Sequence, residues 1–503
     1  MLTCVNLYNS VLRMNDKLDI LAIIVLAIIV SVNVYLSFSQ ALSFEQEEQR
    51  FFCTRKGYVS DEVWYVDAAR NILTKIFGLT PHQEGGESKA TLVYASKEEL
   101  EKAKSLANSF GITILCDRFD KLNAVYVSAK TSESIILFAR ATNATATVFG
   151  WILGDAQNIY EYLNLEHPPS AKYVIALAML ILGDRPLYWR IPSIIMGAAT
   201  VILVFLLTKK LSQSNELGLI AAAATAVDPL LRNMASIAML DIYVTAFSLL
   251  SIYLAANERY REAILLLGFA TTFKFTALTA FLPILCLYVG RTWRETKTST
   301  YRSVLDRTIE MILLMLLSFT FFQLLVAYPV ILRIGIVAWL QQSIFGAISW
   351  HLSTKCVGPN CPISSAPWDW FFGLNSFPLY IYANGTAVYA QGFVPAYAVA
   401  LILMIITLAK RFYEDSDKSL SKKAWIIICG TFVSYILLWI AGSRTQYSFY
   451  AVQLTPLIYA YLTLQLAELL NRENLAQAFL AWRPLFNRQV WEKVLEYILK
   501  LVS

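Results

Sequence analysis

Apolar blocks of about 20 residues recur along nearly the whole length of this 503-residue chain. That length is what a helix needs to cross a bilayer. The composition agrees, because 57% of the residues are hydrophobic and only 16% are charged, whereas soluble proteins carry roughly 25% charged residues. The sequence therefore predicts an all-α polytopic membrane protein.

Short loops rich in Lys and Arg separate the apolar blocks and indicate their orientation. Arg13 and Lys17 precede the first block, which is too long for a cleaved signal peptide. The positive-inside rule then places the N-terminus and the later basic loops in the cytoplasm. About ten spans follow from this rule, at 18–38, 189–208, 216–231, 237–256, 262–273, 276–290, 308–333, 388–409, 424–441 and 447–468.

The same map predicts two long outer loops, at 41–188 and 334–387. The first contains a small α/β insert at about 86–140, with strands expected at 90–94, 113–116 and 124–127 and a helix at 97–110. The insert is either a docking element or a spacer without chemistry. The other units are the N-terminus with the first span (1–40), membrane helices at 189–333 and 388–470, and an amphipathic cytoplasmic tail at 471–503.

Ionisable residues gather at the outer ends of the predicted spans, where charge beside the apolar layer is costly and is usually paired or functional. They are Asp61, Glu62, Glu166, His167, Lys172, Asp228, Arg232, Asp241, Lys274 and Arg444. Their convergence on one face predicts a polar cavity that opens on the non-cytoplasmic side.

The segment YLNLEHPPSAKYVIA, at 162–176, brings charge and two prolines to the start of an apolar run. Proline disfavours a helical residue before it and is tolerated in the first turn of a helix. We therefore expect an amphipathic helix that begins at Pro168 or Pro169 and lies at the outer interface. The second span should then begin at Trp189-Arg190.

Several of these motifs resemble the protein O-mannosyltransferase family and its relatives, the lipid A aminoarabinose transferases, which are GT-C-class membrane glycosyltransferases. The matching elements are the acidic pair Asp61-Glu62, EHPPSAKYVIA with the helix after it, MLDIY, and PWDWFFG at 367–373. The long connection between Asp61 and His167 and the lack of a β-trefoil domain depart from the family pattern and leave the acceptor open.

The resemblance implies a polyprenyl-phosphate sugar donor, such as dolichyl phosphate mannose, and transfer to a protein Ser/Thr hydroxyl with inversion. It implies no nucleotide and no cofactor. Asp61 would be the general base that takes the proton of the acceptor hydroxyl. Cations would stabilise the departing phosphate, with Arg444 as the first candidate, followed by Lys274, Arg232 and Lys172. Glu62 and Asp241 would orient the sugar or hold the basic residues, and Glu166 and His167 would contact the donor.

Each role has a simpler alternative. Asp61 could cap a helix, Asp228 and Arg232 could form an i,i+4 ion pair, and Lys274 could extend to the interface. PWDW could be an interfacial anchor.

Other functions also stay open: transfer of another lipid-linked sugar to a lipid or glycan, transport, or an inactive scaffold. The sequence predicts no metal, since the acidic pair lacks DxD spacing, and no nucleic-acid partner. It leaves open a homo- or heterodimer, and residence in the cell membrane or the endoplasmic reticulum.

The cysteines of the outer loops allow two disulfides. Cys356 and Cys361 are close in sequence and flank a turn, so they form the pair favoured in an oxidising compartment. Cys53 with Cys116 is a second pairing with less support, and free thiols are the alternative.

Overall fold

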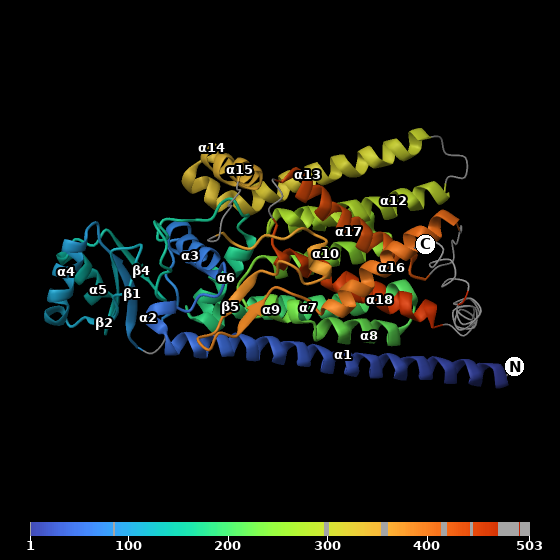
Figure 1. The fold of residues 1–503 in the computed structure, drawn as a ribbon, viewed down its shortest axis with the longest axis horizontal. Helices are drawn as coiled ribbons and strands as arrows, with labels where there is room; N and C mark the ends of the chain where they lie inside the picture. The colour runs from blue at the N-terminus through green and yellow to red at the C-terminus, as the bar shows by residue number, and fades with distance from the viewer. Residues whose placement is uncertain are drawn as a thin grey trace.

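The computed structural model describes residues 2–83, 86–295, 301–353, 361–413, 420–442, 446–470 and 492. A long helical body carries a small sheet with its two helices at one end, and the N-terminus lies at the opposite end (Figure 1). The fold class expected from the sequence, a helical membrane protein with a small α/β insert, is confirmed.

Helix α1 (Leu2–Arg50) runs along one flank of the body (Figure 1). Its part from Asp19 to Arg50 is long and apolar enough to cross a membrane. Side chains such as Ile20, Ile23 and Ile28 are more than half exposed. Such a surface suits contact with lipid, where a helix satisfies its own backbone hydrogen bonds.

The body consists of helices that coincide with the other predicted spans. They are α7 (Pro186–Ser212), α8 (Asn215–Ala226), α9 (Pro229–Ala235), α10 (Asp241–Ala256), α11 (Tyr260–Ala270), η3 (Phe275–Ala280), α12 (Phe281–Glu295), α13 (Tyr301–Ile334), α16 (Val394–Tyr413), α17 (Lys422–Ala441), η6 (Ser448–Gln453) and α18 (Thr455–Leu469). Each of the ten expected segments contains a helix. Five helices of the described residues are long and apolar enough to cross a membrane, and three further apolar helices are shorter.

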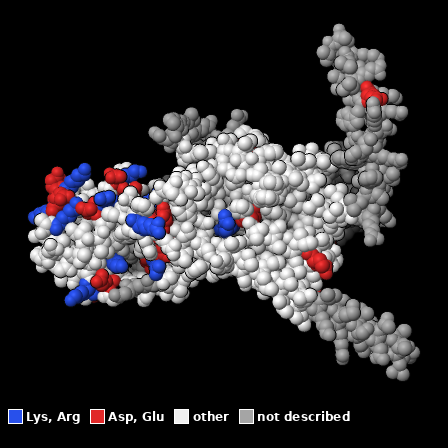
Figure 2. All heavy atoms as spheres, turned by 60° about the horizontal axis from the view of Figure 1, so that its bottom comes forward, with Lys and Arg blue, Asp and Glu red and all other residues white. Residues whose placement is uncertain are grey.

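Figure 2 shows charged side chains gathered on the insert, while this face of the helical body is almost free of them. The basic C-terminal end of α12 and the basic start of α13 lie at the end of the body opposite the insert (Figure 1). This arrangement suits a body in the bilayer with the insert in water.

The insert is an antiparallel sheet with two helices. Its elements follow the order β1 (Ser88–Val93), α4 (Lys97–Leu106), η2 (Ala107–Phe110), β2 (Thr113–Cys116), β3 (Ala124–Ala129), α5 (Ser132–Ala141) and β4 (Ala146–Phe149). The strand order β2-β3-β1-β4 is that of a ferredoxin-like βαββαβ unit. The expected strands and first helix coincide with β1, β2, β3 and α4, whereas α5 and β4 were not anticipated.

A disulfide between Cys53 and Cys116 joins the insert to the short helix α2 (Phe52–Arg55) that follows α1. The pairing with less support in the sequence is thus present in the structure, and Cys361 is disulfide-bonded as well. Trp151 strengthens this connection between the insert and the segment after α1, because its Nε1 donates to the carbonyl oxygen of Lys56 at 2.8 Å. Cys356, the expected partner of Cys361, lies outside the described residues.

Two expected boundaries are shifted. Helix α6 (Ser170–Ile181) begins after Pro169, close to the prediction, but α7 begins at Pro186 and not at Trp189. Proline at the first position of a helix loses no hydrogen bond, which explains the earlier start.

The second outer loop contains α14 (Ile336–Leu340), the π-helical turn η4 (Gln341–Phe345), α15 (Gly346–Ser353), η5 (Asp369–Phe371) and the hairpin β5 (Pro378–Ile381) with β6 (Ala387–Tyr389). The two tryptophans of PWDW lie in different surroundings. Trp368 is exposed and packs on Trp439, but Trp370 is buried and donates from its Nε1 to Ser365.

Candidate functional site

A cavity of about 330 Å³ lies between the first outer loop and the ends of the membrane helices. Its lining residues come from α3 (Glu62–Asn71) and the residue before it, the 162–167 loop, the residue before η3, α15, the second outer loop, and η6 with the residue before it. Four residues predicted for the site, Asp61, Glu166, His167 and Lys274, line it together. The expected convergence of distant charges therefore exists for these four.

Asp61 occupies the N-cap position of α3, yet its side chain makes no capping hydrogen bond. No other described group donates a hydrogen bond to its carboxylate, although the surroundings are dense with protein. Burial raises the pKa of Asp61 to about 6, and Asp241 adds to this effect while Lys274 opposes it. A carboxylate with these properties is suited to accept a proton near neutral pH.

Glu62 lies in different surroundings and does not line the cavity. It is fully buried and accepts two hydrogen bonds from Arg190 of α7, at 2.8 and 2.7 Å. The backbone N–H groups of Val59 and Ala238 also donate to it, at 2.8 and 2.7 Å. The expected contact of Glu62 with the sugar is thus wrong, and the alternative that it holds a basic residue applies. Its lone pairs are fully used by protein donors.

A second buried network fixes the rest of α3. Arg70 donates to both carboxylate oxygens of Asp184, at 2.6 and 3.0 Å, and also to Asp67. Asp67 in turn accepts from Tyr58 at 2.8 Å and from the N–H of Gly154 at 2.9 Å. Because both ends of α3 are tied into the protein in this way, Asp61 has a fixed position at the edge of the cavity.

Lys274 is the charged group opposite Asp61. It immediately precedes η3, and its Nζ contacts both carboxylate oxygens of Asp241 at 2.8 and 3.0 Å. The ammonium also lies 4.3 Å from the ring centre of Tyr450 and 5.4 Å from that of Phe449. Asp241, which was expected at the site, lies behind Lys274 and does not line the cavity.

The 162–167 loop supplies a polar wall. The hydroxyl of Tyr162 donates to Glu166, and the side-chain amide of Asn164 donates to both of them, at 2.9 Å to Tyr162 and 3.1 Å to Glu166. His167 packs its ring edge-on against Tyr65 and Trp350, with ring centres 5.7 and 6.4 Å apart. The loop thus presents one carboxylate and one imidazole within an aromatic frame.

Lys172 is buried beneath this loop and does not reach the cavity. Its Nζ donates to the carbonyl oxygens of Leu163, Asn164 and His167. The predicted phosphate contact of Lys172 is therefore wrong, because the ammonium is used to hold the loop backbone.

Arg232 is also absent from the cavity. The expected ion pair with Asp228 is not formed. Asp228 instead caps α9 by accepting from the N–H groups of Leu230 and Leu231, and it accepts from Tyr459 at 2.8 Å. Arg444, the first candidate for the phosphate, lies outside the described residues.

Aromatic residues, most of which were not assigned to the site from the sequence, complete the cavity. They are Trp64, Tyr65, Tyr162, Trp350, Phe377, Tyr447, Phe449 and Tyr450. Rings with a few polar groups between them are typical of ligand sites. Part of this wall belongs to the segment TQYSFY, whose clustered rings were the available signal.

An apolar groove of about 310 Å³ lies next to the cavity. The two share elements: Lys274 of the cavity precedes Phe275 of the groove, and Trp350 of the cavity lies on α15 with Ala347 and Ile348 of the groove. Phe319 and Leu438 line it from α13 and α17. The charged cavity therefore adjoins a surface suited to a hydrocarbon chain.

Residues 166–318 match the family model of the dolichyl-phosphate-mannose-protein mannosyltransferases. This segment includes Glu166, His167, Arg190, Asp241 and Lys274 but neither Asp61 nor the insert. A polyprenol-phosphate-mannose–protein mannosyltransferase of Corynebacterium glutamicum is 32% identical over 96 residues, which are 19% of this chain and 18% of the relative.

Two solved structures are also similar. The oligosaccharyltransferase of Archaeoglobus fulgidus in its apo form has a TM-score of 0.44 at 12% identity and covers 91% of this chain and 51% of its own. The archaeal oligosaccharyltransferase AglB of the same organism, in complex with an inhibitory peptide and a dolichol-phosphate, has a TM-score of 0.36 at 13% identity and covers 62% of this chain and 43% of its own.

The family-model match includes the EHPPSAK segment that carries the resemblance in the sequence, whereas the acidic pair Asp61-Glu62 lies outside the match. Within residues 166–318 the chain is therefore similar to the dolichyl-phosphate-mannose-protein mannosyltransferases.

Proposed function

We propose that this chain transfers mannose from a polyprenyl-phosphate donor to the hydroxyl of a protein Ser or Thr, with inversion at the sugar carbon. The observation that carries the proposal is the pair of groups facing one cavity: the carboxylate of Asp61, without a hydrogen-bond donor among the described residues, and the ammonium of Lys274. The family match and the activity by which the Corynebacterium relative is named support the donor class.

The two groups divide the reaction between them. Asp61 takes the proton of the acceptor hydroxyl as its oxygen attacks the anomeric carbon. The bond between that carbon and the phosphate oxygen breaks, and the polyprenyl phosphate leaves with the electron pair. Lys274 stabilises the negative charge on the departing phosphate. A single displacement of this kind inverts the sugar carbon and needs one base.

The other groups of the cavity bind and orient the substrates. Glu166 and His167 supply polar contacts for the sugar hydroxyls, and the aromatic rings supply apolar faces for the ring carbons. The groove beside Phe275 and Phe319 accommodates the first isoprene units of the donor. The reaction takes place on the non-cytoplasmic side, the side to which the basic loops assign the insert.

The test uses membranes that contain the full chain. They are incubated with labelled polyprenyl-phosphate mannose and a Ser/Thr-rich peptide, and in parallel with a labelled nucleotide sugar in place of the lipid donor. The proposal predicts label on the peptide from the lipid donor alone. Label that reaches only lipid or glycan would favour transfer of a sugar to those acceptors, and no label transfer from the lipid donor to any acceptor would contradict the proposal.

A further inference from the structure

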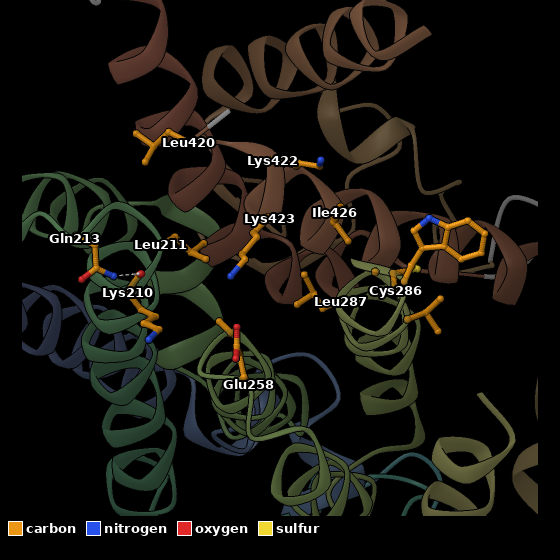
Figure 3. Close-up of a pocket in the computed structure, with 14 residues that line it drawn as sticks. Lys210, Leu211, Gln213, Glu258, Cys286, Leu287, Leu420, Lys422, Lys423 and Ile426 are labelled. Carbon is orange, nitrogen blue, oxygen red and sulfur yellow. Dashed lines mark hydrogen bonds between the residues drawn. The ribbon is translucent and has the colours of Figure 1, made fainter. Parts of the chain in front are cut away.

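A second cavity, of about 870 Å³, lies at the end of the body opposite the insert. Its walls are the end of α7, the turn between α10 and α11, the end of α12 and the start of α17 (Figure 3). It is more than twice as large as the cavity of Asp61. About 20 residues of α7 separate Arg190 from Lys210, which is roughly 30 Å at 1.5 Å per residue, so the two cavities are distinct.

Positive charge dominates the lining of this cavity. Lys210 comes from α7, and Lys422 and Lys423 come from the first turn of α17 (Figure 3). The acidic residue of the lining, Glu258, is paired with Arg291 at 3.0 Å. No carboxylate of the residues that the structure describes forms an ion pair with Lys210 or Lys423. Counted over the residues that the structure describes, the lining of the cavity therefore has a net positive charge, which suits an anion.

The rest of the wall is apolar. Figure 3 shows Leu287 and Ile426 nearer to Lys423 than Cys286, the residue that precedes Leu287 on α12. Trp293 follows on the same helix and is 55% exposed. Tryptophan is enriched where a bilayer meets water. A fully water-soluble anion would not cover the apolar side chains of Leu287 and Ile426, whereas a lipid would cover them with its hydrocarbon.

The position of the cavity fits the cytoplasmic leaflet. The basic loops surround it, and the positive-inside rule assigns this end to the cytoplasm. Basic pockets between membrane helices on that side bind anionic headgroups. We propose that the cavity binds one anionic phospholipid, with its phosphate between Lys210 and Lys423 and an acyl chain along Leu287 and Ile426. This inference does not depend on the sugar-transfer proposal.

The test compares the wild-type protein with the Lys210→Gln/Lys423→Gln variant in nanodiscs made of phosphatidylcholine with or without phosphatidylglycerol. Lipids that stay bound after gentle extraction are counted by native mass spectrometry. Because each lysine near an anionic lipid contributes about 1 kcal/mol, two of them predict an approximately thirtyfold weaker retention of phosphatidylglycerol. Inorganic phosphate is added in a separate arm as the soluble competitor.

The matched control is Lys102→Gln/Lys130→Gln, which removes the same charge from exposed positions of the insert. It should retain phosphatidylglycerol as the wild type does. Equal retention of phosphatidylglycerol by the Lys210/Lys423 variant would overturn the proposal. So would equal retention of phosphatidylcholine by the wild type, or displacement of the lipid by millimolar phosphate.

Discussion

Asp61 and Glu62 are neighbours in the chain, but their carboxylates lie in opposite surroundings. Asp61 faces the cavity and receives no hydrogen bond from a described group, whereas Glu62 is fully buried and accepts from Arg190 and two backbone N–H groups. An acidic pair that looks like one motif in the sequence thus divides into a carboxylate that faces the cavity and a carboxylate held in a buried ion pair. Substitution of Asp61 should therefore lower the rate of transfer, whereas substitution of Glu62 should lower the stability of the protein.

Glu62→Gln should lower the stability of the protein, with little change in the chemistry of the molecules that fold. Removing one partner of a buried ion pair leaves an uncompensated charge on Arg190, which costs about 3–5 kcal/mol. The measurement is the folded fraction after extraction, by size-exclusion chromatography, together with the transfer rate per folded molecule.

The control for this prediction is Glu62→Gln/Arg190→Met, which removes both charges and should be more stable than Glu62→Gln alone. A fully folded Glu62→Gln protein without transfer activity would instead give Glu62 a part in the chemistry.

Lys274 should affect the use of the donor. Asp241→Asn/Lys274→Gln removes both members of the buried pair, so no unpaired charge stays behind. Loss of a charge-assisted hydrogen bond to phosphate costs about 1.5–3 kcal/mol, which predicts a decrease of about 10- to 100-fold in kcat/KM for the lipid donor.

Lys75→Gln is the control for the Lys274 variant, since Lys75 forms a partly exposed pair with Glu161 outside the cavity. It should keep the wild-type kcat/KM. An unchanged kcat/KM in the Asp241/Lys274 variant would remove Lys274 from phosphate stabilisation.

The rate of transfer should increase with pH through about 6. Burial raises the pKa of Asp61 to about 6, and a general base acts only when it has lost its proton. The protonated fraction therefore increases as the pH falls, and kcat/KM at pH 5 should be about tenfold below its value at pH 7. A flat profile from pH 5 to 7 would correspond to an ordinary carboxyl pKa, near 3.9, and would contradict the described surroundings.

The disulfide between Cys53 and Cys116 should stabilise the folded insert and its attachment to the membrane body. The two cysteines are 63 residues apart, and closing a loop of this length contributes about 4 kcal/mol in the chain-entropy model. Cys53→Ser/Cys116→Ser should make the insert sensitive to limited proteolysis at lower temperature, while Cys286→Ser, a change at a free cysteine, should not. Equal sensitivity of both variants would contradict a stabilising role.

The sequence predicted those features that depend on a local pattern, such as a charged residue at the end of an apolar block. Charges at the ends of apolar blocks predicted that Asp61, Glu166, His167 and Lys274 meet, because each would be costly in lipid. The insert was recognised as α/β from its alternating strands. Helix α5 was missed because the sequence of its apolar run, SIILFARA, does not show that this run packs against the sheet of the insert.

The sequence could not show which charged side chains form ion pairs with one another. Arg190, Asp184 and Arg70 lie in ordinary positions along the chain, and only the packing of α3 against α7 and the loops shows that they anchor the base. For the same reason Arg232 and Lys172 were wrongly expected at the phosphate. Which way a charged side chain points at the end of a helix depends on tertiary neighbours.

The most direct measurement of the central claim is the transfer of labelled mannose from polyprenyl phosphate to a Ser/Thr peptide by Asp61→Asn. The control is Asp120→Asn, an exposed change in the insert. General-base catalysis contributes about 10²–10⁴-fold, so Asp61→Asn should fold normally and lose at least about 100-fold in rate, while Asp120→Asn keeps the wild-type rate. A folded Asp61→Asn protein with a rate close to that of the wild type would contradict the account.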